Sequence, residues 1–170
     1  MAKRFYSGKT YTHATGHSCA FRQWRADSHC NLIHGYALQF EFTFGCDELD
    51  DRNWAVDFGG LKPLKEWLKY MFDHTYLVAE DDPELETFKQ LQEKNLVDLR
   101  IVPATGCERF AEQAFDEAER IVNDISNGRC WVQKVTVKEH DANSATCELA
   151  DTQKVRFTMD PELNIMKNDE

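Results

Sequence analysis

The stretch ALQFEFTF, residues 37–44, decides the fold class of this chain. One leucine and three phenylalanines alternate in it with glutamine, glutamate and threonine, a period of two that is typical of a strand with one buried face. A weaker strand is expected before it, over residues 4–15. We expect the two to pair antiparallel through a long loop that includes residues 18–31.

The period changes after this pair of strands. Apolar residues from Leu61 to Phe72 recur at helical spacing behind Pro63, which is tolerated in the first turn of a helix. A second helix, acidic and more exposed, is expected over residues 83–95. A third, over residues 110–125, is stopped by Asn127-Gly128.

Strand periodicity returns after the third helix. Trp131, Val135 and Val137 are expected on one face of a strand, and a last strand is expected over residues 146–158. The order of two strands, helices and two strands predicts an α+β fold, with the helices on one face of an antiparallel sheet. Because a four-stranded sheet has open edges, we expect a symmetric oligomer.

The length of 170 residues predicts a single domain, residues 1–170, with a core over about 5–158 and a tail over 159–170. The net charge of −10 argues against a surface adapted to nucleic acid or to an anionic membrane. Residues 1–45 carry five basic and two acidic side chains, so an anionic ligand is expected to bind there. With no apolar segment of membrane-spanning length and no signal peptide, the expected compartment is the cytoplasm, where the six cysteines remain thiols.

Chemistry-bearing residues gather in CNLIHGY, residues 30–36. His34 and Tyr36 are two apart on an extended chain, so their side chains share a face about 6.6 Å apart and can reach one ion. The alternative is a turn glycine between two half-buried aromatic residues. His13 and His17 lie about 13 Å apart if their segment is extended, so only one of them is a candidate ligand, and His17 is the better placed.

Two downstream features are further candidates. Asp73 can orient the imidazole of His74 as a proton carrier, or His74 can simply complement the dipole at a helix end. Glu139 ends a mostly apolar strand face and needs a partner, such as a ligand that donates two N–H groups. The alternative places Glu139 beyond the core, in a loop over residues 139–144.

In order, these motifs resemble the family of 6-pyruvoyl-tetrahydropterin synthase and 6-carboxytetrahydropterin synthase, the latter an enzyme of 7-deazaguanine (queuosine) biosynthesis. The resemblance covers about residues 5–157 and rests on five separated matches. They are His17 in THATGH, Cys30 to Tyr36 in CNLIHGY, Val56-Asp57-Phe58, Asp73-His74 and Glu139.

The resemblance implies a zinc-dependent lyase that acts on 7,8-dihydroneopterin triphosphate. It implies that the residues at positions His17, His34 and Tyr36 bind the zinc ion and that Cys30 acts as the base. It further implies that Asp73 and His74 transfer protons and that Glu139 anchors the pterin ring. Thr105 and Glu108 match the start of the family's last long helix and would also contact the pterin, while Arg22 and Arg25 would hold the triphosphate. The implied product is 6-carboxytetrahydropterin. Formation of 6-pyruvoyl-tetrahydropterin, or a non-catalytic pterin or purine binder, is the alternative.

The implied architecture is the tunnelling fold, in which trimers close a β-barrel and stack as a hexamer. The sequence departs from the family at Tyr36, where the third zinc histidine is expected. Four outcomes stay open there: zinc bound through the phenol, a recruited water or other residue, a different metal, or an empty site. A second departure is Cys107, which stands where the family usually carries threonine or serine.

Overall fold

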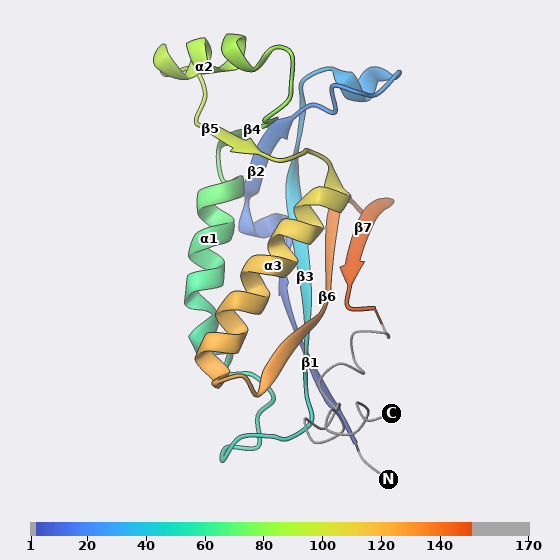
Figure 1. The fold of residues 1–170 in the computed structure, drawn as a ribbon, viewed down its shortest axis with the longest axis vertical. Helices are drawn as coiled ribbons and strands as arrows, with labels where there is room; N and C mark the ends of the chain where they lie inside the picture. The colour runs from blue at the N-terminus through green and yellow to red at the C-terminus, as the bar shows by residue number, and fades with distance from the viewer. Residues whose placement is uncertain (1–2, 151–170) are drawn as a thin grey trace, which may run out of the picture.

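The computed structural model describes residues 3–150, which form a curled sheet with three α-helices (Figure 1). The strands are β1 (Phe5–Tyr11), β2 (His17–Phe21), β3 (His34–Cys46), β4 (Thr75–Ala79), β5 (Leu99–Val102), β6 (Cys130–His140) and β7 (Asn143–Glu148). The helices are α1 (Lys62–Phe72), α2 (Leu85–Glu93) and α3 (Cys107–Ser126), with 3-10 turns η1 (His13–Thr15), η2 (His29–Asn31) and η3 (Phe58–Leu61). The predicted strand residues 151–158 and the predicted tail 159–170 lie outside the described residues.

Strand β3 is the centre of the sheet. It pairs antiparallel with β6 along one side, and β6 pairs antiparallel with β7. On its other side, residues 34–38 pair with β2 and residues 40–46 pair with β1. The expected antiparallel sheet is therefore present, but its first strand is divided by η1 and by Gly16, whose φ of 83° turns the chain. Strand β2 also takes residues that the sequence assigned to a loop.

Two further strands correct the prediction of a purely antiparallel four-stranded sheet. Strand β4 pairs parallel with β2, and β5 pairs parallel with β4, which gives a mixed sheet of seven strands over the described residues. All five residues of β4 are buried. A strand covered on both faces has no polar alternation, which is why periodicity missed it.

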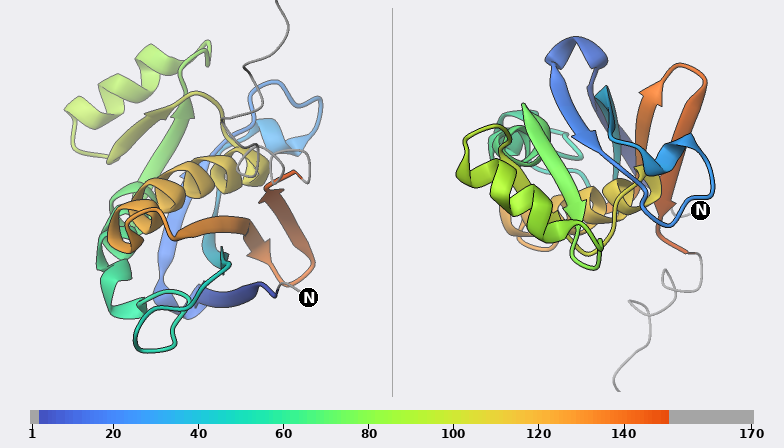
Figure 2. Two further views of the ribbon diagram at one scale, coloured as in Figure 1. Left: turned by 60° about the horizontal axis from the view of Figure 1, so that its bottom comes forward. Right: turned by 90° about the horizontal axis from the view of Figure 1, so that it is seen from above.

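The helices lie on two sides of this sheet rather than on one. Helices α1 and α3 lie against the sheet face that carries Leu38, Phe40, Phe42 and Phe44, and together they close the main core (Figure 1). Helix α2 covers the other face of β4, where Phe88 packs against Tyr76 in a second cluster. Figure 2 shows α2 beside β4 and β5, away from the end of the sheet formed by β6 and β7.

A β-bulge in β6 changes which of its residues are buried. The register with β3 passes from Thr43–Lys134 to Phe44–Val132, so Gln133 is the extra residue. Val132 is therefore buried in the core, and Trp131, expected on the core face, packs over Gly45 instead. None of the helices between residues 3 and 150 has the length and the apolar character that crossing a bilayer requires.

Candidate functional site

Tyr36 lies at the meeting point of four segments that are distant in sequence. Burial raises the pKa of its phenol, and the ionisable groups of Glu139, Cys30 and Cys107 raise that pKa further. Tyr36 is on β3, Glu139 near the end of β6, Cys107 at the start of α3 and Cys30 in η2. The fold therefore places a carboxylate and two thiols close enough to the Tyr36 phenol for their charges to act on it.

Glu139 lies close enough to Cys107 to affect the pKa of its thiol. Burial raises the pKa of the Cys107 thiol, and the neighbouring Glu139 carboxylate raises it further by charge and by hydrogen bonding. The thiol therefore stays protonated at neutral pH and can donate to the carboxylate. Glu139 lies within β6, which continues to His140, so the alternative that placed it in a loop is wrong.

The start of α3 approaches the β2–η2 loop closely at Gly106. Its φ is 115°, and a Cβ at this position would lie 2.3 Å from the side-chain nitrogen of Gln23. Only glycine fits this backbone conformation and this approach. Sequence reasoning did not single out Gln23, because nothing in its local pattern shows that it packs on a helix 83 residues away.

His34 and Tyr36 share the sheet face of β2 with Phe21. The register pairs His34 with Phe21 and Tyr36 with Cys19. The Phe21 ring centroid lies 4.9 Å from that of His34 and 6.2 Å from that of Tyr36, and the latter two are 5.6 Å apart. His34 Nδ1 lies 2.7 Å from the Leu32 carbonyl oxygen and donates to it, which leaves Nε2 for a ligand.

His17 lies elsewhere on the same face. It is paired with Leu38, four residues along β3 from His34, a separation of about 13 Å on a strand. Its side chain is 3% exposed and packs edge-on against Tyr11 and Phe40. Burial lowers the pKa of His17, opposed in part by the charge of Asp73. The structure does not bring His17 together with His34 and Tyr36.

The side chains present do not fit a zinc site of three imidazoles. Beside His34 stand a phenol, Tyr36, and a phenyl ring, Phe21, which has no lone pair to donate. Among residues 3–150, no three histidine, cysteine or acidic side chains are grouped so that they could hold a metal ion. The chemistry that we propose for this pocket therefore uses the protein side chains themselves, with no step through zinc.

Asp73 and His74 are paired as the sequence suggested, but on the other side of the sheet. Asp73 Oδ1 lies 2.5 Å from His74 Nδ1, and the His74 side chain is 88% exposed. His74 lines a pocket of about 280 Å³ together with Ala20 and Ile33. Because Ala20 alternates with Cys19 and Phe21 along β2, this pocket faces away from Tyr36. His74 and Tyr36 therefore lie on opposite faces of the sheet.

Arg22 and Arg25, which were expected to hold the triphosphate, are both paired with acidic residues of the same chain. Arg22 donates from Nε and Nη2 to the two carboxylate oxygens of Asp82, at 2.8 and 2.6 Å. Arg25 pairs with Asp81 and stacks on Trp24. These two of the five basic side chains of residues 1–45 are thus paired with acidic residues from the β4–α2 loop.

Thr105 and Glu108 take different positions at the start of α3. Thr105 donates its hydroxyl to the backbone oxygen of Arg22 at 2.6 Å and so connects the start of α3 to the β2–η2 loop. Glu108 is exposed, and it contributes to the raised pKa of Cys107. Cys107, whose role the sequence left open, is thus the residue of this segment that borders Glu139.

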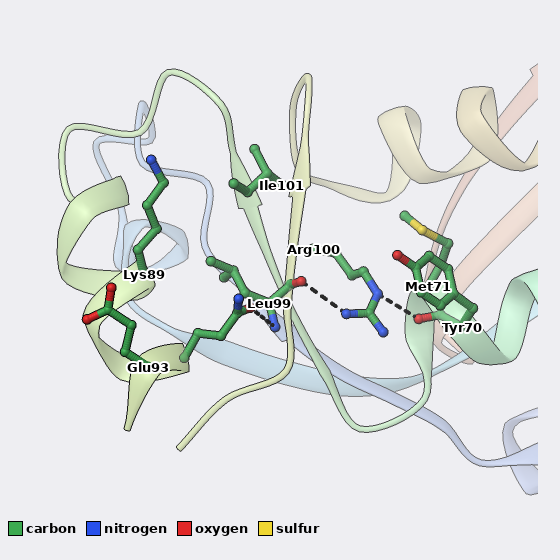
Figure 3. Close-up of a pocket in the computed structure, with 8 residues that line it drawn as sticks. Tyr70, Met71, Lys89, Glu93, Leu99, Arg100 and Ile101 are labelled. Carbon is green, nitrogen blue, oxygen red and sulfur yellow. Dashed lines mark hydrogen bonds between the residues drawn. The ribbon is translucent and has the colours of Figure 1, made fainter. Parts of the chain in front are cut away.

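A larger pocket, of about 520 Å³, lies between α1, α2 and β5 (Figure 3). The Arg100 guanidinium crosses it, lies over the Tyr70 ring at 4.1 Å, and donates to the Tyr70 carbonyl at 2.9 Å. None of the predicted site residues lines this pocket. Its polar groups are largely satisfied within the chain, so it is a weaker site candidate than the cluster around Tyr36.

Comparison with known proteins gives consistent matches. A family model described as 6-pyruvoyl tetrahydropterin synthase matches residues 10–150. The 6-carboxy-5,6,7,8-tetrahydropterin synthase of Aquifex aeolicus is 26% identical over 134 residues, 76% of this chain and 82% of that protein. The Rickettsia conorii protein of the same name is 32% identical over 57 residues, which span 33% of this chain and only 41% of that relative.

Solved structures show the same fold at low identity. An uncharacterized protein from Wolinella succinogenes superposes with a TM-score of 0.70 at 14% identity, covering 87% of this chain and 98% of that one. The 6-pyruvoyl tetrahydropterin synthase of Plasmodium falciparum superposes with a TM-score of 0.62 at 12% identity, covering 86% and 98%.

Proposed function

The chain belongs to the 6-pyruvoyl tetrahydropterin synthase family, and on that premise we propose that it is a lyase of the 6-carboxy-5,6,7,8-tetrahydropterin synthase type. Its proposed substrate is 7,8-dihydroneopterin triphosphate. The names of the curated relatives support this product over 6-pyruvoyl-tetrahydropterin. The single observation that carries the proposal is the half-buried Glu139 carboxylate beside the Cys107 thiol and the Tyr36 phenol.

Glu139 is suited to anchor a pterin ring. A pterin presents two N–H donors side by side, and a carboxylate accepts such a pair with two parallel hydrogen bonds. The Cys107 thiol can occupy a remaining lone pair of Glu139 and so hold its orientation.

Cys30 is the proposed base for the substrate side chain. It lies in η2, half-buried and close enough to Tyr36 for its charge to act on the phenol. A thiolate can remove a C–H or O–H proton only when it lies close to that proton. The Tyr36 hydroxyl can form a hydrogen bond to the substrate side chain and so hold it near Cys30.

The Asp73–His74 pair requires a second copy of the chain to reach Cys30. Within one chain it faces away from Tyr36. Over residues 3–150, strands β1 and β7 each pair on one side only, so both offer free backbone groups to a neighbouring copy. We propose a trimer or hexamer in which His74 of one copy transfers protons in the site of the next. We propose no triphosphate-binding role for Arg22 or Arg25, because both are paired with acidic residues of the same chain.

Product analysis tests the proposal. The purified chain is incubated with 7,8-dihydroneopterin triphosphate, and the pterin products are identified by mass spectrometry beside a Glu139→Gln variant. We expect 6-carboxytetrahydropterin, acetaldehyde and triphosphate from the wild type, and at least about a tenfold lower rate from the variant. A product with the mass of 6-pyruvoyl-tetrahydropterin would shift the assignment to that activity.

A non-catalytic pterin or purine binder is the second candidate. The observation that favours it is the donor set around His34, which lacks the three imidazoles of the family's zinc site. It predicts saturable pterin binding with no new product. Neither binding nor turnover with any reduced pterin would exclude both candidates.

A further inference from the structure

The corner where β2 meets β3 holds three rings on one face: Phe21, His34 and Tyr36. Their centroids are 4.9 to 6.2 Å apart, a spacing at which three imidazoles could converge on one ion. Here only His34 offers a nitrogen. The position opposite it in the register carries the phenyl ring of Phe21, which cannot bind a metal ion.

Phe21 is held firmly in this position. It is 0% exposed, and its ring packs edge-on against Phe110 of α3 at 5.0 Å. Rotation of Phe21 away from His34 would leave a cavity in the main core, and such cavities cost several kcal/mol. Another donor from the described part of the chain therefore cannot take its place without rearranging β2 against α3.

Two other imidazoles lie near this corner. The ring centroid of His140, on β6, is 6.0 Å from that of Tyr36, and together with His34 it gives two imidazoles beside the phenol, one fewer than a site of three imidazoles. The other, on the same face as His34, is fixed in the sheet. His17 lies about 13 Å along the strands from His34, between the rings of Tyr11 and Phe40. The register between β2 and β3 determines this distance. A shift of β2 by two residues would move the His17 side chain by only about 7 Å and would disrupt every residue pair between β2 and β3.

We infer that this pocket works without a resident metal ion, and that the Tyr36 hydroxyl and His34 Nε2 meet the ligand by hydrogen bonds instead. The Tyr36 phenol both donates and accepts, and His34 Nδ1 is already used on the Leu32 carbonyl. The inference that the ligand is a pterin rests on the proposed function, whereas the inference that the chain holds no metal ion does not.

Metal analysis of the purified protein tests the inference. Wild type, Tyr36→His and the double variant Phe21→His/Tyr36→His are loaded with zinc, passed through gel filtration and measured by plasma mass spectrometry. We expect less than about 0.1 zinc per chain in the wild type and about one in the double variant, which is the only one of the three proteins with imidazoles at positions 21, 34 and 36 together. Circular dichroism checks that each variant is folded.

Two controls make the result decisive. His34→Ala in the double variant should abolish zinc uptake, while His29→Ala, which removes an exposed imidazole of η2, should not. About one zinc per wild-type chain that is lost with His34→Ala would overturn the inference. A folded double variant without zinc would overturn the assignment of Phe21 to a ligand position.

Ligand binding separates this inference from the proposed function. Affinity for 7,8-dihydroneopterin is measured with and without a strong chelator. Equal affinities in both conditions support metal-free binding, and a loss of at least about tenfold with chelator contradicts it. If the wild type binds no pterin, the proposed function fails, while the zinc measurements still decide the metal question.

Discussion

The Asp82 carboxylate holds the Arg22 guanidinium through two hydrogen bonds, at 2.8 and 2.6 Å, and the Asp82 side chain is only 1% exposed. Burial alone would raise the pKa of Asp82, but Arg22 and the Glu84 N–H lower it overall. Arg22→Ala leaves this carboxylate buried without its partner. We expect the free energy of unfolding to fall by about 3–5 kcal/mol in urea titrations.

Arg25 provides the matched control for that prediction. Its pair with Asp81 is at the surface, with side chains 64% and 42% exposed. Arg25→Ala should therefore lower the free energy of unfolding by less than about 1 kcal/mol. Equal effects of the two substitutions would show that Arg22–Asp82 is not a buried structural pair.

His17 predicts a pH dependence of stability. Burial lowers its pKa in the folded chain, so below about pH 6.5 the unfolded chain binds a proton that the folded chain does not. The contribution of His17 to stability is therefore complete above pH 6.5 and decreases as the pH falls. Urea titrations between pH 7 and 5 should show a shallower decrease for His17→Leu than for the wild type. Parallel pH profiles would contradict a neutral, buried His17.

The cysteines should differ sharply in reactivity. Burial raises the pKa of Cys19 to about 12, and it also raises the pKa of Cys46. Cys30 is half-exposed in η2 and is open to reagents. Brief treatment of the native protein with iodoacetamide at pH 8, followed by peptide mass spectrometry, should label Cys30 well before Cys19 or Cys46. Labelling of Cys19 as fast as Cys30 would argue against this packing.

Gly45 predicts a local steric effect. A Cβ at this position would lie 2.5 Å from the Trp131 ring. Gly45→Ala should therefore displace the indole and lower the free energy of unfolding by about 1–3 kcal/mol. Gly8→Ala is a suitable control, because a Cβ at Gly8 has its nearest neighbour at 3.6 Å. Thermal unfolding of both variants would distinguish them.

Elements with strong periodicity could be predicted from the sequence. The central strand, the three helices and the stop at Asn127 all lie where the apolar spacing placed them. Strands β4 and β5 were missed, because short strands without polar alternation carry no period. The bulge at Gln133 was missed for a related reason: an extra residue changes the phase of a strand without changing its composition.

The candidate site could be predicted only in part. The charges of Cys30 and Glu139 act on Tyr36, so these three motif residues lie near one another, while their roles remain proposals. The place of His17 could not be predicted, because strand register depends on pairing across a turn and not on spacing within one segment. Nor does local sequence show that Arg22 meets a carboxylate 60 residues away.

In the proposed function, Glu139 anchors a reduced pterin beside Cys107 and Tyr36. Equilibrium binding of 7,8-dihydroneopterin, followed by its fluorescence, is measured in the wild type and in Glu139→Gln. Glu66→Gln, an exposed site on α1, serves as the matched control. We expect at least about tenfold weaker binding for Glu139→Gln and unchanged binding for Glu66→Gln. Wild-type affinity in Glu139→Gln would contradict this expectation.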